Sequence, residues 1–188
     1  MNKIVDRWQA QDGAWLEMRR MRPSDAPLVK DSLNRLSTGA RRNRFFASIA
    51  EFSDQAVQRL VEVDPARVYP LIVLKVLDGV PTPIAGGRFI QEDKGTDCSF
   101  SVLVGDPWQG QGIGRRIVKA LLHEASRRGL RQIYGQVLSD NQPMLKLAHS
   151  LHFVALEGDG EGVVNIVCDI LDPSSPHRRS LLEKVLGR

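Results

Sequence analysis

Apolar and polar residues alternate along several short runs of the chain, and the clearest early run is 15–21. A period of two predicts a half-buried strand, which Arg22-Pro23 ends. Ser24 stands where a helix cap is expected, and the apolar residues after it recur at helical spacing up to Leu36. The pattern therefore predicts one amphipathic helix there and a second helix over 53–63.

Three strand-like runs come next, over 69–77, 84–91 and 98–104. Turn residues separate them at Asp78-Gly79 and at Lys94-Gly95. Apolar runs joined by such short turns are typical of neighbouring strands that reverse direction. We expect an antiparallel meander.

The second half of the chain returns to helical spacing. Residues 113–128 carry their apolar positions on one face and stop at Gly129, which suits a left-handed helix cap. Further runs predict a strand over 132–138, a helix over 142–151 and a last strand over 163–171. Strands and helices mixed in this order predict an α+β fold, with a parallel crossover that begins at 102–128.

The length of 188 residues and the 42% hydrophobic share are those of one ordinary globular domain. We place this domain at 1–172 and interpret 173–188 as a proline-containing linker with a short basic helix. No apolar run approaches the roughly 20 residues that span a bilayer, and the start lacks the pattern of a signal peptide. These features predict a soluble, cytoplasmic protein with no membrane partner.

The net charge of +4 arises from basic residues scattered among carboxylates, so a small polyanionic ligand accounts for it as well as a nucleic acid does. Nucleic-acid binding is the least supported function, because no aromatic-plus-basic motif accompanies the charge. The run Arg41-Arg42-Asn43-Arg44 fits an acidic partner, the 3′-phosphate of a nucleotide cofactor, or a solvated helix face. Cys98 and Cys168 match neither a disulfide framework nor a zinc site, so we expect reduced core cysteines and no metal.

A glycine-rich segment, Gln109-Gly110-Gln111-Gly112-Ile113-Gly114, lies between the strand that ends at Val104 and the next helix. Glycines there expose backbone N–H groups at a helix N-terminus, where the helix dipole favours phosphate oxygens. Arg115 or Arg116 is expected to add a charged contact. The segment lacks the Lys-Ser or Lys-Thr of a Walker A loop and the later acidic residue of a Rossmann fold. Spacing alone leaves open a phosphate cradle and a turn that only packs the helix.

The pattern Gln109-x-x-Gly112-x-Gly114 resembles the acyl-CoA loop of the GNAT acetyltransferase superfamily. The resemblance continues through Gly135-Gln136-Val137-Leu138, Asn141 and Leu151-His152-Phe153. Segments at 21–25, 44–46 and 59–64 are similar to the GNAT domain of bacterial protein-lysine acetyltransferases. The resemblance implies the GNAT acyl-CoA N-acyltransferase fold, a mixed central sheet of about six to seven strands with helices on both faces.

The resemblance also implies a co-substrate and the residues that hold it. Acetyl-CoA is expected to lay its pyrophosphate on the glycine loop and Arg115, and its pantetheine arm along Val102, Leu103 and Val104 and beside Asn141. An amine, of which a protein lysine is one candidate, would then attack the thioester, so the protein must orient two substrates and accept a proton. The sequence leaves both a monomer and a homodimer open.

The catalytic positions are where the chain departs from the family pattern. Lysine-modifying relatives carry a glutamate base in the strand before the loop, and this chain has Ser99 there. A serine hydroxyl holds a water but is a poor proton acceptor near neutral pH. Asp97 shares a strand face with Ser99 if the strand extends that far, and is otherwise a solvated turn residue. The tyrosine acid of many relatives is matched by Ala148.

Two functions from different classes follow from this departure. The first is an acetyl-CoA-dependent N-acetyltransferase that uses Ser99 and Asp97. The second is a CoA-sensing or regulatory domain that keeps the cofactor loop and has reduced or lost catalysis.

Overall fold

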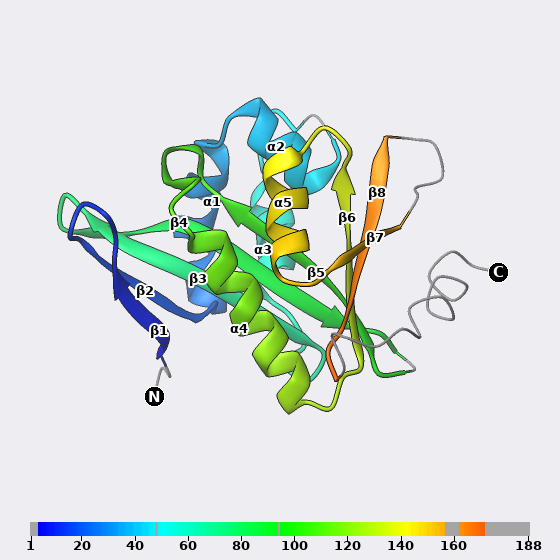
Figure 1. The fold of residues 1–188 in the computed structure, drawn as a ribbon. Coiled ribbons are helices and arrows are strands. Elements are labelled where there is room, and N and C mark those ends of the chain that lie inside the picture. Colours follow the sequence, from blue (N-terminus) through cyan, green and yellow to red (C-terminus); the bar gives the residue numbers. More distant parts are fainter. Residues whose placement is uncertain (1–3, 48, 94, 157–161, 172–188) are drawn as a thin grey trace. The chain divides into compact units, whose positions relative to one another are not determined.

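The computed structural model describes residues 4–47, 49–93, 95–156 and 162–171 (Figure 1). The expected linker and basic helix at 173–188 lie outside these residues. The chain divides into two compact units: Met1–Ile90 with Ser101–Leu121, called unit 1, and Gln91–Phe100 with Leu122–Arg188, called unit 2. Strand β5 (Asp97–Val104) and helix α4 (Ile113–Arg127) each contribute residues to both units.

The strands of unit 1 form an antiparallel series in chain order, β1 (Ile4–Gln9), β2 (Trp15–Arg20), β3 (Val68–Leu77) and β4 (Val80–Gln91). The β1–β2 hairpin, blue in Figure 1, lies beside β3. β1 is absent from the sequence-based prediction. β4 begins four residues earlier than predicted, because a register shift at Val73/Leu74 accommodates Pro83 opposite Leu74.

Three short helices follow β2: α1 (Ala26–Asn34), α2 (Thr38–Phe45) and α3 (Asp54–Val61). The prediction of a helix capped by Ser24 is wrong at its start, because Pro23–Asp25 form a 3-10 turn. The Asp25 carboxylate accepts two 2.8 Å hydrogen bonds from Arg19 and one from the Arg22 amide, which fixes this turn in the protein interior. Helix α2 was not predicted.

The two faces of the unit 1 sheet carry different helices. Val29, Leu33, Val57 and Val61 of α1 and α3 form one core cluster with Ile72 and Leu74 of β3. On the other face, a Cβ added to Gly87 would lie 2.5 Å from the Ile117 side chain of α4. Neighbouring residues of a strand point to opposite faces of a sheet. Helices α1 and α3 therefore cover one face of the unit 1 sheet, and α4 covers the other.

Unit 2 contains β6 (Gln132–Leu138), α5 (Gln142–Ser150), β7 (Val154–Leu156) and β8 (Val163–Asp169). β6 pairs in parallel with β5 over Asp97–Ser99, and antiparallel with β8, which in turn pairs with β7. The α+β class is confirmed. The described residues contain eight strands rather than six to seven, because β1 and the three-residue β7 add to the predicted set.

The two cysteines behave as core residues. Cys98 and Cys168 are free thiols with 0% and 4% exposure. Burial, together with Asp97 and Glu92, raises the pKa of Cys98 to about 12. The thiol is therefore protonated at neutral pH and unsuited to act as a nucleophile.

Candidate active site

The glycine loop connects the end of β5 to the start of α4 within unit 1. A 3-10 turn, Asp106–Trp108, follows Gly105, and helix α4 begins at Ile113. Gly110 and Gly112 have φ of 74° and 77°, and a Cβ at either position would meet no atom within 4 Å. Glycine is needed here because of the backbone conformation. The space beside it stays open for a ligand.

Two glutamine side chains hold the loop closed on itself. Gln109 donates a 3.1 Å hydrogen bond from Nε2 to the Val104 carbonyl, and Gln111 donates one of the same length to the Pro107 carbonyl. The indole of Trp108 lies 4.3 Å from the Lys75 ammonium, an arrangement that anchors the turn. The loop is thus shaped by its own side chains.

The loop presents backbone amides at the N-terminus of a long helix. The Arg116 amide, at 3.2 Å from the Gly112 carbonyl, makes the first turn of α4. The amides of Ile113 and Gly114 precede any acceptor within the helix, as in every helix N-terminus. Ile113 is 1% exposed and fixes where the helix starts. A phosphate at this end meets N–H groups and the positive end of the helix dipole.

The two arginines of the first turn have different surroundings. Arg116 pairs with Asp6 at 2.9 Å and lies over the Trp8 ring. Arg115 is exposed beside the loop. Both arginines are candidates for the charged contact to the cofactor, and the pairing of Arg116 with Asp6 favours Arg115.

The predicted catalytic residues lie together in unit 2. β5 begins at Asp97, so Asp97 is the first residue of the strand and shares a face with Ser99. Ser99 is paired with Tyr134 of β6, and Asp97 with Gln132. Asp97 therefore belongs to the strand and not to the turn that precedes it.

Sequence reasoning missed a tyrosine–carboxylate pair formed by Tyr134 of β6 and Glu92, the residue that follows β4. The Tyr134 hydroxyl donates a 2.7 Å hydrogen bond to Glu92, and burial followed by this carboxylate raises the pKa of Tyr134 to about 12. The phenol stays protonated at neutral pH. Tyrosine is common in buried strands, so the sequence does not mark Tyr134 as a functional residue. Its position opposite Ser99 in the sheet does.

The remaining residues expected to hold the cofactor lie at the end of β5 and at the start of α5. Val102, Leu103 and Val104 form the half-buried end of β5, just before the loop. Asn141 caps α5, with its side-chain oxygen accepting a 3.3 Å hydrogen bond from the Met144 amide. Ala148, at the position where many relatives carry a tyrosine, is 2% exposed and buried within unit 2.

The part of the chain that the structure describes contains neither a metal-ligand cluster nor a membrane-spanning helix. Within those residues, no three or more His, Cys, Asp or Glu side chains gather as a metal site. No helix among them is long and apolar enough to cross a membrane.

Comparison with known proteins gives a consistent result. The model of the acetyltransferase (GNAT) family matches residues 36–153. Acetyltransferase PA5475 of Pseudomonas aeruginosa is 28% identical over 151 residues, which are 79% of this chain and 81% of that protein. Acetyltransferase Pat of Mycolicibacterium smegmatis is 30% identical over 86% of this chain, but the match spans only 48% of Pat.

Solved structures share the fold. The GNAT domain of S. lividans PAT superposes with a TM-score of 0.77 at 22% identity, over 87% of this chain and 96% of that one. The putative acetyltransferase yncA from Salmonella typhimurium, solved with its cofactor acetyl-CoA, gives a TM-score of 0.61 at 18% identity, over 82% and 94% of the two chains.

Proposed function

Because this chain belongs to the GNAT family of acetyltransferases, we propose that it transfers an acetyl group from acetyl-CoA to a primary amine, with a protein lysine among the candidate acceptors. The observation that carries the proposal is the glycine loop. Gly110 and Gly112 adopt positive φ immediately before α4, where a helix N-terminus presents amides that suit a phosphate, and a Cβ at either glycine would meet no atom within 4 Å. The relatives that are named acetyltransferases support the same activity.

The cofactor would be held by parts of the chain with distinct tasks. The amides from Gly110 to Gly114 would bind the pyrophosphate, and Arg115 would add a charged contact. Gln109 and Gln111 keep the loop in shape through their bonds to Val104 and Pro107. The family resemblance gives the pantetheine arm to Val102, Leu103, Val104 and Asn141.

The reaction needs a neutral amine, whose nitrogen attacks the thioester carbonyl. The carbon–sulfur bond then breaks, the thiolate of CoA leaves, and one proton is lost from nitrogen. In this chain Ser99 would hold a water that passes the proton to Asp97, which lies two residues away on the same strand face. Tyr134, on the neighbouring strand, is protonated at neutral pH and donates its one hydroxyl proton to Glu92, so it would not be the proton acceptor.

A CoA-sensing domain is the second candidate, and a specific observation favours it. Ser99 carries no carboxylate and Ala148 carries no phenol, so the two groups that relatives use for proton transfer are missing at their usual positions. Such a domain would bind acetyl-CoA through the same loop and release no thiol.

One experiment separates the two candidates. Acetyl-CoA binding is measured by calorimetry, and free thiol release is measured across a panel of small amines and lysine-containing proteins. The enzyme gives binding and amine-dependent thiol release. Binding without release across the whole panel would contradict the proposed activity and favour the sensor.

A further inference from the structure

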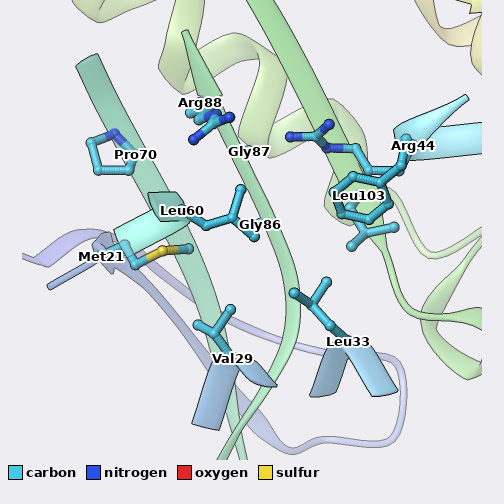
Figure 2. A pocket seen from close by; sticks show the side chains of 11 residues that line it. Met21, Val29, Leu33, Arg44, Leu60, Pro70, Gly86, Gly87, Arg88 and Leu103 are labelled. Atoms are coloured by element: carbon cyan, nitrogen blue, oxygen red, sulfur yellow. The ribbon is translucent and has the colours of Figure 1, made fainter. Parts of the chain in front are cut away.

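A small pocket lies inside unit 1, on the face of the sheet that α1, α2 and α3 cover (Figure 2). Its volume is about 70 Å³. Seven apolar side chains form most of its wall, and Gly86 and Gly87 complete it without side chains. The apolar residues are Met21, Val29, Leu33, Phe45, Leu60, Pro70 and Leu103.

Two arginines interrupt this apolar wall. Arg44 comes from α2 and Arg88 from β4, and Figure 2 shows both guanidinium groups at the same side of the pocket. Burial lowers the pKa of Arg44 to about 10, with a smaller contribution from the charge of Arg88. Burial also lowers the pKa of Arg88. The pocket therefore holds two positive charges that are partly shielded from water.

No carboxylate among the described residues offsets these charges. The Arg44 guanidinium lies 4.8 Å from the centre of the Phe45 ring, and among the described residues Arg88 is the charged group that lowers its pKa. This contrasts with Arg19, which is buried against Asp25, and with Arg116, which pairs with Asp6. Two like charges held together without a counter-ion are costly, and a bound anion would remove that cost.

Helix α2 and strand β5 connect the pocket to the cofactor loop within unit 1. Helix α2 carries Arg44 near its C-terminal end, and Ser37 at its N-cap is hydrogen-bonded to Asp106 of the loop. Leu103 lines the pocket two residues before Gly105, where the loop begins. A group bound at the arginines would thus lie beside the strand end that leads into the loop.

We propose that Arg44 and Arg88 bind the carboxylate of the acceptor, so that the preferred substrate is a small amine that carries a carboxylate on a short apolar stem. This inference rests on the proposed acetyl transfer and specifies its substrate class. The planar carboxylate matches the donor geometry of guanidinium groups, and the aliphatic wall matches the stem. The carboxylate is unchanged in the reaction, in which only the amine nitrogen gains the acetyl group.

A binding experiment tests the pocket without requiring turnover. Butyrate and its neutral isostere butyramide are titrated into the full chain and into Arg44→Gln, Arg88→Gln and the exposed control Arg59→Gln. Wild type and Arg59→Gln are expected to prefer butyrate by about tenfold or more, and the two pocket variants to lose that preference. Equal affinity of wild type for the two probes, or an unchanged preference in folded pocket variants, would overturn the proposal.

Thermal melting confirms that each variant is folded. If Arg88→Gln does not fold, Arg44→Gln decides the outcome, and Arg88→Lys adds a variant that keeps the charge but loses the planar donor geometry. Arg88→Lys is expected to retain part of the preference for butyrate.

A turnover experiment distinguishes this proposal from the acetyl transfer on which it rests. ω-Amino acids from β-alanine to 6-aminohexanoate are compared with the alkylamines of equal length. A higher kcat/KM for the amino acids that disappears in Arg44→Gln supports the pocket. Equal kcat/KM for both series would overturn the pocket and leave acetyl transfer standing, whereas butyrate selectivity without any turnover would contradict only the transfer.

The cofactor itself is the competing occupant. If Arg44→Gln weakens binding of acetyl-CoA but not of acetyl-dephospho-CoA, the arginines bind the 3′-phosphate and the proposal is overturned. The proposal expects both cofactors to bind the variant as they bind wild type.

Discussion

Ser37 and Asp106, 69 residues apart in the sequence, are joined by two hydrogen bonds. The Ser37 hydroxyl donates to Oδ1 at 2.6 Å and its amide donates to Oδ2 at 3.0 Å. Burial raises the pKa of Asp106, but these two bonds outweigh it and the pKa is lowered. The N-terminus of α2 is thereby tied to the turn that opens the glycine loop.

Ser37→Ala is expected to affect both the stability of the fold and the cofactor. The Ser37 hydroxyl also accepts a hydrogen bond from the Ala40 amide, so the change removes a helix cap, which typically costs about 1 kcal/mol. It also removes one of the two hydrogen bonds that join α2 to Asp106 and leaves the bond from the amide of residue 37, so we expect several-fold weaker acetyl-CoA binding by calorimetry.

Ser53→Ala is the matched control. Ser53 caps α3, also an eight-residue helix, and accepts a 3.2 Å hydrogen bond from the Ala56 amide without touching the loop. We expect a similar fall in melting temperature with unchanged acetyl-CoA affinity. Equal effects of the two changes on affinity would show that the link to Asp106 is unimportant for the loop.

Gly112→Asp is expected to abolish acetyl-CoA binding. A side chain at φ 77° strains the backbone by about 1–2 kcal/mol, and its negative charge would repel the pyrophosphate. Gly129, at φ 71° after the end of α4, has equally open space around it. Gly129→Asp should therefore cost similar stability and leave the calorimetric affinity for acetyl-CoA intact.

Much of the fold could be predicted from the sequence, because period-two and helical patterns follow directly from burial on one face. The missed elements lack such a pattern. Helix α2 contains three arginines and few apolar residues, and it is held by the Ser37 cap and by Arg41, which donates to the carbonyls of Asn34 and Ile49. Strand β7 has only three residues, too few to show a period.

The site could be predicted only where a local motif encodes it. The glycine loop could be found because positive φ demands glycine at fixed spacing. Arg44 and Arg88 are separated by more than forty residues, and only the packing of α2 against the sheet brings them to one pocket. The Tyr134–Glu92 pair likewise depends on which strands are neighbours. Pairings of this kind leave no periodic signal.

Acid should weaken the fold through Glu124. Hydrogen bonds from Arg127, aided by those from Arg128 and opposed by burial, lower the pKa of Glu124 from 4.5 to about 2. Its stabilising contribution is therefore complete above pH 4.5 and is lost as the pH falls toward 2. Glu124→Gln should lower the unfolding free energy by about 1–3 kcal/mol at pH 7 and flatten its decline between pH 4.5 and 2 in urea titrations. A parallel decline in both proteins would contradict this role.

Ser99→Glu tests the missing base. If residue 99 faces the reacting amine, a carboxylate there supplies a proton acceptor, and general-base assistance is typically worth about 10²- to 10⁴-fold in rate. We expect faster amine acetylation, with a gain that grows as the pH rises and the base ionises. Ser99→Gln has a similar size without the charge, so an equal rate in the two variants would mean that the proton leaves by another route.

Transfer of an acetyl group from acetyl-CoA to an amine yields free CoA and an N-acetylated amine in equal amounts, so both products are measured together. Wild type and Gly112→Asp are incubated with acetyl-CoA and the amine panel, and free CoA and N-acetylated amine are both quantified by mass spectrometry. We expect one acetylated amine for each CoA released by wild type, and neither product above background with Gly112→Asp. Wild-type protein that binds acetyl-CoA yet forms no acetylated amine beyond the protein-free background would contradict it.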